Sequence, residues 1–165
     1  KNLYIIGTMN TADKSLVQID EALRRRFAFE ELMPNPDLLD DRPSKKYKNI
    51  MVKLNEKIVD TPERMKRYRD RQIGHTYFWN LENNEDLRFM IKYKIIPLLQ
   101  DYFYDDYSEI RRILGDKIIA KNDSPGDILN EKDGDRLFEE LTNSLSKKQT
   151  ESLTTDTSET TEEEN

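Results

Sequence analysis

Two groups of residues near the start of the sequence have the side-chain types that phosphate chemistry needs. Asn10 and Asp13 lie in a Met-Asn-Thr-Ala-Asp stretch that directly follows an apolar run at residues 3–6. The side chain of an asparagine can hold a water molecule through its carbonyl oxygen and contact a phosphate oxygen through its NH₂ group. Consecutive arginines follow at residues 24–26, and an arginine can neutralise charge on a transferring phosphoryl group. These residue types in this order indicate a site that handles phosphate.

The elements expected around these residues would carry the two groups to different places. The run at residues 3–6 is typical of a strand buried on both faces of a parallel sheet. Ligands of such sheets bind beyond the carboxyl ends of the strands. A capping-box pattern at Ser15 predicts a helix whose apolar residues recur up to Phe27. The arginines span about 200° of that helix, so at least one must point away from the core, where it could enter a neighbouring subunit's site.

From about residue 36 onward the sequence predicts an all-helical unit. Helices are expected to start at Pro62 and after Asn83, and one is expected to end at Gly115. Pro97 lies inside the longest helical pattern and predicts a kink or a break there. The apolar positions expected to face the core are Tyr47, Ile50, Met51, Leu54, Ile58, Leu87, Met90, Ile91, Ile95, Leu98, Leu99, Phe103, Leu137, Phe138 and Leu141.

These patterns divide the sequence into three parts. Residues 1–35 are expected to be a piece of α/β sheet, with a second short strand at 28–32. Residues 36–143 would be the helical unit, and residues 144–165 a disordered acidic tail. Because two strands do not make a stable parallel sheet alone, we expect partner strands upstream of the sequence.

The composition limits the classes of chemistry that the chain can support. Of the 165 residues, 35% are hydrophobic and 36% are charged, which is polar for a globular protein. Six acids and no base fall within residues 149–165, so a net charge of −6 leaves residues 1–148 at zero. The absence of cysteine excludes disulfide and thiolate chemistry and suits a reducing, cytoplasmic compartment. No apolar run approaches the roughly 20 residues of a membrane span.

The stretches IIGTMNTADKS and IDEALRRRF closely resemble the McrB-type AAA+ GTPases, the motor subunits of restriction systems that depend on modified cytosine. The resemblance covers about residues 2–110, including a later IGHTYF stretch, and corresponds to the second half of the AAA+ module. It implies the end of a P-loop NTPase parallel sheet followed by an all-α helical lid, so a mostly helical α/β fragment. It also implies GTP or ATP with Mg²⁺, a homo-oligomeric ring, an McrC-type endonuclease partner, and DNA contacts made by domains outside this sequence.

The resemblance also implies roles for individual residues. Asn10 matches the first sensor, which orients the attacking water, and Asp13 matches the acid of the MNTAD turn. Arg25 and Arg26 match arginine fingers that act across a subunit interface. Gly74 and His75 fall where the lid would face the base and the phosphates of the nucleotide. The sequence itself holds no metal-ligand cluster, and no residue is assigned as a second sensor.

Simpler interpretations of the same residues stay open. Asn10 could merely cap a turn, Asp13 could favour a helix dipole, and His75 could be a structural residue. The arginine triplet could be a solvated face. In a different class of function, the helical unit would be a non-catalytic module that binds DNA or protein through basic residues at 62–71 and 88–94. Strong DNA binding by the chain with a steep salt dependence would favour that module.

The sequence lacks a GxxxxGK[ST] phosphate loop and a strand that ends in Asp-Glu. We therefore expect the 165-residue chain alone to hydrolyse neither GTP nor ATP, because the groups that grip the phosphates and the metal are not in it. A phosphate-release assay on the purified chain tests this, and turnover above the protein-free blank would contradict it.

Overall fold

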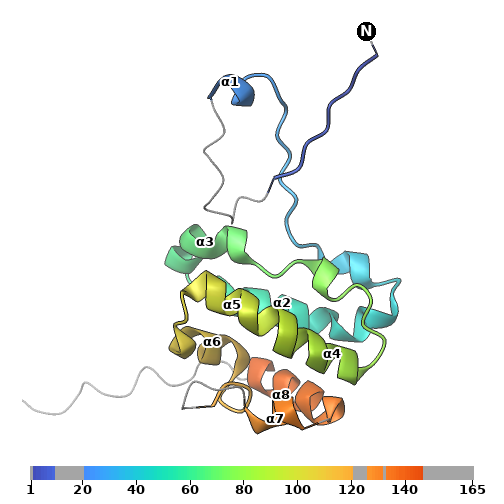
Figure 1. The fold of residues 1–165 in the computed structure, drawn as a ribbon, viewed down its shortest axis with the longest axis vertical. Helices are drawn as coiled ribbons and strands as arrows, with labels where there is room; N and C mark the ends of the chain where they lie inside the picture. Colours follow the sequence, from blue (N-terminus) through green and yellow to red (C-terminus); the bar gives the residue numbers. More distant parts are fainter. Residues whose placement is uncertain (1, 10–20, 121–125, 132, 147–165) are drawn as a thin grey trace, which may run out of the picture.

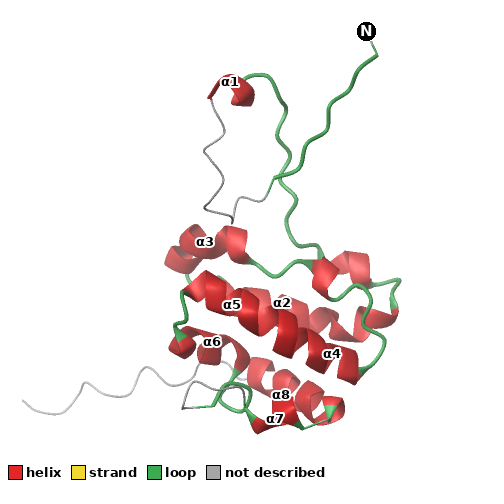
Figure 2. Cartoon of the chain, viewed as in Figure 1, coloured by secondary structure: helices red, strands yellow, loops and turns green. Residues whose placement is uncertain are grey.

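The computed structural model describes residues 2–9, 21–120, 126–131 and 133–146, and it is mostly helical (Figures 1 and 2). Its helices are, in chain order, α1 (Glu21–Arg24), η1 (Pro36–Leu39), η2 (Pro43–Tyr47), α2 (Lys48–Ile58), α3 (Pro62–Tyr68), η3 (Arg69–Arg71), η4 (His75–Tyr77), α4 (Asn84–Met90), η5 (Ile91–Ile95), α5 (Ile96–Phe103), α6 (Tyr107–Leu114), α7 (Asp127–Asn130) and α8 (Gly134–Ser146). None of these helices is long and apolar enough to cross a membrane.

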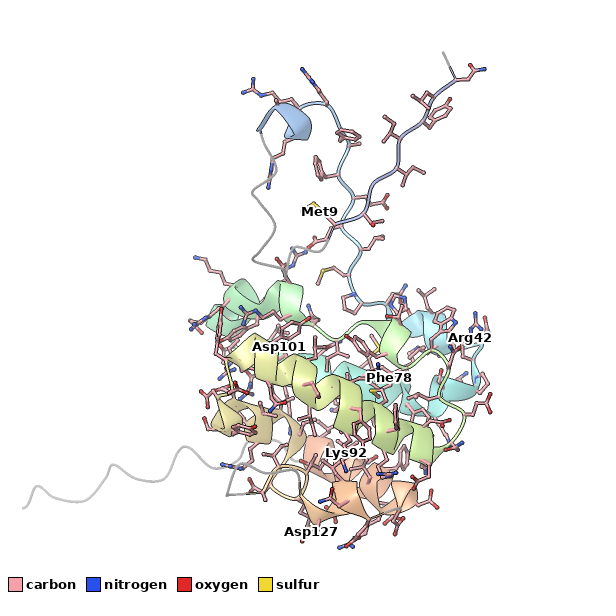
Figure 3. All side chains as sticks on the ribbon, viewed as in Figure 1. Met9, Arg42, Phe78, Lys92, Asp101 and Asp127 are labelled. Carbon is pink, nitrogen blue, oxygen red and sulfur yellow. The ribbon has the colours of Figure 1, made fainter. Side chains whose placement is uncertain are left out.

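One hydrophobic core runs through the helical body from Leu39 to Leu145. The rod formed by α4, η5 and α5 lies in front of α2, with α3 above and α6, α7 and α8 below (Figure 1). Within the helical unit from residue 36 onward, every position that the helical spacing predicts to face inward is buried, apart from Leu98 and Phe138, which are half-buried. Phe78 lies inside this body, whereas Met9 lies well outside it (Figure 3). The helical lid expected from the sequence is therefore confirmed as an all-α unit.

The strands expected at residues 3–6 and 28–32 are not present in the described residues. Leu3, Tyr4, Ile5 and Ile6 are 67–92% exposed, and residues 28–32 are exposed as well. A strand is stabilised by hydrogen bonds to a neighbour, and no described residue offers a paired edge. The apolar residues at 3–6 and 28–32 predict strands because they predict burial, and burying them would need partner strands.

The helix expected from Ser15 to Phe27 is described only in its last part. Residues 10–20 lie outside the described residues, α1 covers Glu21–Arg24, and Phe27 is 43% exposed rather than buried. α1 lies apart from the helical body and is joined to it by an irregular segment without secondary structure (Figure 2). Residues 25–35, called the arm below, connect this short helix to η1.

Pro97 does not interrupt the long rod. A proline has no N–H to donate to the carbonyl four residues earlier, so an unmodified α-helix would lose a bond here. The rod widens instead into the π-helical segment η5, in which the N–H of Ile96 donates to the carbonyl of Ile91. The change of hydrogen-bond register comes directly before Pro97, and the helix then continues to Phe103.

An ion-pair network ties α2, α3 and α6 together. Arg64 donates to Glu109 at 2.5 Å, and Arg112 contacts both Glu109 and Asp60. The guanidinium of Arg64 lowers the pKa of the Glu109 carboxyl through this hydrogen bond, against desolvation, which raises it. Lys57 donates to the carbonyls of Arg112 and Ser144, and burial lowers the pKa of its ammonium group.

The start of α8 packs directly against the start of α4. Asn84 accepts a hydrogen bond from Tyr47 Oη and donates one to Asp135, at 2.7 and 2.6 Å. The N–H of Gly134 donates to Glu85 Oε1 at 2.6 Å. A Cβ atom at Gly134 would lie 2.3 Å from the carbonyl carbon of Asn84, so only glycine fits this approach.

We predict that Gly134→Ala lowers the free energy of unfolding by about 1–3 kcal/mol, because the added methyl group meets backbone atoms that cannot move away without shifting a helix. The same change in an exposed helix would be neutral or stabilising. Urea denaturation measures the effect, with Glu139→Ala on the exposed side of α8 as the control. Equal stability of Gly134→Ala and the wild-type chain would contradict the close packing of α4 on α8.

Candidate functional site

The stretch Gly74–Tyr77 forms a tight turn whose two ends are fixed in the core. Ile73 and Phe78, the residues on either side, are both 0% exposed. The turn itself is the 3₁₀ helix η4, His75–Tyr77, in which Phe78 N–H donates back to the carbonyl of His75. The turn between the buried residues Ile73 and Phe78 is thus held in one conformation at the surface of the helical body.

Asn55 on α2 provides the hydrogen bonds that place this turn. Its Nδ2 donates to the carbonyl of Ile73 at 2.9 Å, and its Oδ1 accepts from the N–H of Ile73 at 2.6 Å. Asn55 is only 7% exposed, so both bonds lie out of water. A side-chain amide that satisfies both backbone groups of one residue fixes that residue as a strand partner would.

Helical periodicity does not single out Asn55, although the sequence holds a signal for it. Asn55 lies next to Leu54 and four residues after Met51, within the buried face of α2. An amide in such an apolar face must find a partner, because a buried polar group without a hydrogen bond is costly. The partner, however, lies 18 residues away and cannot be identified from helical periodicity.

His75 contacts the residue at which the arm ends. The N–H of Asn35 donates to Nδ1 of His75 at 3.2 Å, so the proton of the neutral ring lies on Nε2. The His75 ring packs near Trp79, with 6.0 Å between centroids, and the Arg42 guanidinium lies 4.0 Å from the centre of the Trp79 ring. The structure thus places His75 at the junction of the arm and the helical body.

Gly74 has a backbone conformation that any residue can adopt. Its φ is −69°, and a Cβ atom there would meet only Thr76 Oγ1, at an ordinary van der Waals distance of 3.5 Å. The fold of the chain therefore does not require glycine at this position. Without a side chain, the backbone between Ile73 and His75 stays open to close approach from outside.

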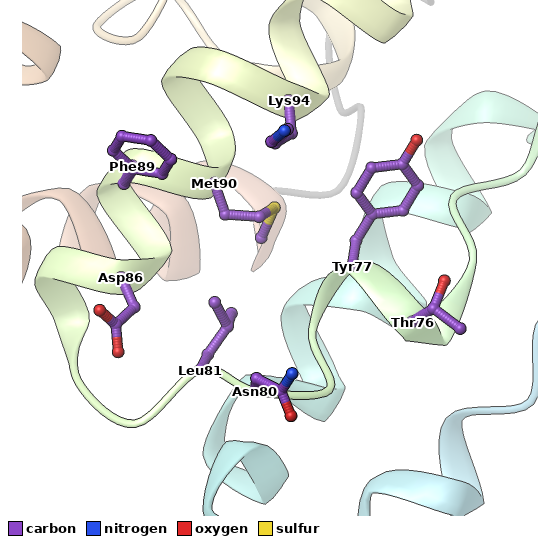
Figure 4. Close-up of a pocket in the computed structure, with 8 residues that line it drawn as sticks. All are labelled: Thr76, Tyr77, Asn80, Leu81, Asp86, Phe89, Met90 and Lys94. Atoms are coloured by element: carbon purple, nitrogen blue, oxygen red, sulfur yellow. The ribbon is translucent and has the colours of Figure 1, made fainter.

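An open pocket of about 490 Å³ lies beside the turn (Figure 4). Thr76 and Tyr77 from the turn form one side, and Phe89, Met90 and Lys94 from α4 and η5 form the other. The remaining lining residues are Asn80, Leu81 and Asp86. The lining residues offer aromatic and apolar surface together with one ammonium group, one amide, one carboxylate and two hydroxyl groups.

Asp86 lines the pocket but has a structural task. Its Oδ2 accepts hydrogen bonds from the N–H groups of Glu82 and Asn83, at 2.9 and 3.1 Å. Asn83 in turn accepts from the N–H of Asp86, which completes a capping box at the start of α4. The Asp86 carboxylate thus caps the start of α4. Lys94 is the cationic residue in the lining of the pocket.

The other residues expected to act at the site lie in two places. Asn10 and Asp13 lie outside the described residues. Arg25 and Arg26 are exposed in the turn that follows α1, far from the pocket along the chain. The structure brings together Gly74 and His75 with the arm, and the roles expected for these residues stay predictions.

Several of the arginines at 64–71 have partners within the chain. Arg64 pairs with Glu109, and Arg69 pairs with Glu31 of the arm at 2.7 Å. Arg71 donates to the carbonyl of Tyr102 and lies 5.3–5.8 Å from the ring centres of Tyr68, Tyr102 and Tyr104. Much of the positive charge that a nucleic-acid-binding surface along α3 would need is therefore used in contacts within the chain.

We predict that Asn55→Ala destabilises the chain by about 2–6 kcal/mol, because it leaves two buried backbone groups of Ile73 unpaired at about 1–3 kcal/mol each. Chemical denaturation gives the value. Asn49→Ala is the matched control, since Asn49 lies exposed in the same helix and should change stability by less than about 0.5 kcal/mol. If the two variants are equally stable, Asn55 does not hold the turn.

Comparisons with known proteins match the helical body. Residues 46–111 match the family described as McrB, alpha-helical lid domain. The chain is 36% identical over 135 residues to the Type IV methyl-directed restriction enzyme EcoKMcrB subunit of Escherichia coli (strain K12). That alignment covers 70% of this chain and 29% of the relative, so the chain spans less than a third of the length of the curated protein that it matches.

Proposed function

Because the chain is of the McrB type and carries the helical lid of that family, we propose that it is the C-terminal part of an AAA+ GTPase motor subunit of a restriction system. The observation that carries this proposal is the turn at Gly74–Tyr77, fixed by Asn55 and open at its backbone, beside a pocket lined by Lys94. A lid must present such a rigid surface to a nucleotide if its closure is to follow nucleotide binding.

The turn is the part of the lid that faces the nucleotide in this proposal. The open backbone at Gly74 accommodates a close neighbour, and the pocket behind it offers Tyr77 and Phe89 for a flat aromatic base. Lys94 supplies a positive charge within reach of the same pocket. These residues bind and orient the nucleotide, and closure of the lid keeps bulk water away from it, apart from the one water that reacts.

In this proposal, Asn10, Arg25 and Arg26 act on the reacting phosphate. Asn10 orients the water that attacks the γ-phosphate in line with the leaving oxygen. Arg25 or Arg26 enters the site of the next subunit and stabilises the negative charge of the transition state, which fits their exposure beyond α1. Asp13 completes the MNTAD turn that places Asn10.

GTP or ATP with Mg²⁺ supplies the phosphoryl group and the metal charge that neutralises it. No group of three or more Asp, Glu or His side chains in the described ranges could hold a metal ion. In this proposal the metal is held mainly by residues outside this sequence, and the chain contributes the sensor, the fingers and the lid.

The proposed assembly follows from the arginine fingers. A finger that acts in trans requires a neighbouring subunit, so the motor works as a homo-oligomeric ring. An McrC-type endonuclease is the partner that receives its output, and DNA is recognised by domains outside this sequence. The similarity to a restriction enzyme subunit supports the endonuclease partner and the DNA-recognising domains of this proposal.

We predict that replacing Arg25 and Arg26 with alanine in the complete subunit lowers turnover by about 10³–10⁵, the amount that arginine fingers contribute elsewhere. Nucleotide affinity should be unchanged, because the fingers act on a neighbouring site. Steady-state phosphate release and equilibrium nucleotide binding measure the two effects.

Arg24→Ala is the matched control for this experiment. Arg24 is the adjacent exposed arginine, at the end of α1, and its loss should leave turnover within a few-fold of the wild type. Turnover that survives the double replacement would show that the finger assignment is wrong.

A further inference from the structure

The arm meets the helical body at Asn35. Its side-chain Oδ1 accepts from the N–H of Asp37 at 3.0 Å and caps η1. Its own N–H donates in the other direction, to Nδ1 of His75 at 3.2 Å. Asn35 and His75 are 40 residues apart in the sequence, so this bond joins the end of the arm to the turn that the proposed function assigns to the nucleotide.

His75 is itself held by the helical body. Its neighbours Ile73 and Phe78 are buried, and Asn55 fixes Ile73 from α2. The ring packs near Trp79, whose carbonyl accepts a hydrogen bond from the buried Ser44 at 3.3 Å. The imidazole therefore offers Asn35 an acceptor whose position is set by the core.

A second contact between the arm and the helical body is of a different kind. Glu31 and Arg69 form an ion pair at 2.7 Å, with side chains 52% and 50% exposed. Ion pairs at such exposure contribute little to stability and are weakened by salt. The bond at Asn35 is also exposed, but its acceptor is a half-buried ring whose neighbours Ile73 and Phe78 are buried, so the position of the acceptor is better defined than that of the Arg69 side chain.

We propose that His75 is a positioning residue that couples the turn facing the nucleotide to the arm that carries Arg25 and Arg26. The expected effect on turnover rests on the proposed function. The coupling between His75 and Asn35 does not, and it can be measured in the chain alone. A displacement of the turn would move Nδ1 of His75 and with it the end of the arm at Asn35. Residues 25–35 contain no regular secondary structure in this chain, and the arm contacts the helical body at Glu31 and Asn35, next to η1.

The first test measures hydrogen exchange of the Asn35 amide in the chain, by NMR. His75→Ala should raise its exchange rate by about 2- to 10-fold, the range expected when one net hydrogen bond is lost. His75→Asn should restore the wild-type rate, because an asparagine Oδ1 can take the place of Nδ1 as acceptor. Glu31→Gln is the control for the exposed ion pair and should leave the rate within about twofold.

Amides in α2 and α8 distinguish coupling from a general loss of structure. Their exchange should be the same in all four proteins. If His75→Ala leaves the Asn35 amide unchanged, or raises exchange in α2 and α8 by the same factor, the proposal is overturned.

The second test measures turnover in the complete subunit. His75→Ala should lower kcat severalfold with little change in KM, and His75→Asn should recover the wild-type kcat. An unchanged kcat in His75→Ala would overturn the positioning role. Failure of the proposed function looks different, because then the double arginine variant keeps its turnover while the Asn35 amide still responds to His75→Ala.

Discussion

The buried pairing of Asn55 with both backbone groups of Ile73 is the constraint on which the arrangement of the site depends. It joins the loop at Ile73 to α2, the helix that contributes many residues to the core. Because Ile73 is fixed, Gly74 and the turn after it have one position relative to α4 and η5, and the pocket between them has a defined shape. A polar pair inside an apolar face thus determines the geometry of the surface above it.

The helical unit is larger than the region that the family match covers. The match ends at residue 111, whereas the core continues through Ile118, Leu129 and α8 to Leu145. α8 contacts α4, α2 and α6, and Gly134 allows its start to approach Asn84 without a gap. A lid cut at residue 111 would expose the apolar faces of α2 and α4, so the last helix is needed to close the core.

The sequence predicts the helices well and the site only in part. Periodicity identifies the buried face of α2 and the rod from Asn84 to Phe103, because burial of an apolar face is a local pattern. It does not predict α7 or the π segment before Pro97, because these depend on contacts and hydrogen-bond register. The expected strands at 3–6 and 28–32 need partners that periodicity cannot supply. Asn55 and the bond from Asn35 to His75 join residues 18 and 40 positions apart, which no spacing rule reveals.

In the proposed function, the turn at 74–77 and its pocket face the nucleotide of an McrB-type motor. Hydrogen exchange of the complete subunit, with and without a non-hydrolysable GTP analogue, tests it most directly. Exchange should slow across residues 73–81, which contain the turn and one wall of the pocket, while α6 on the other side of the lid stays unchanged. Unchanged exchange at 73–81 with saturating analogue, or protection confined to α6, would contradict the account.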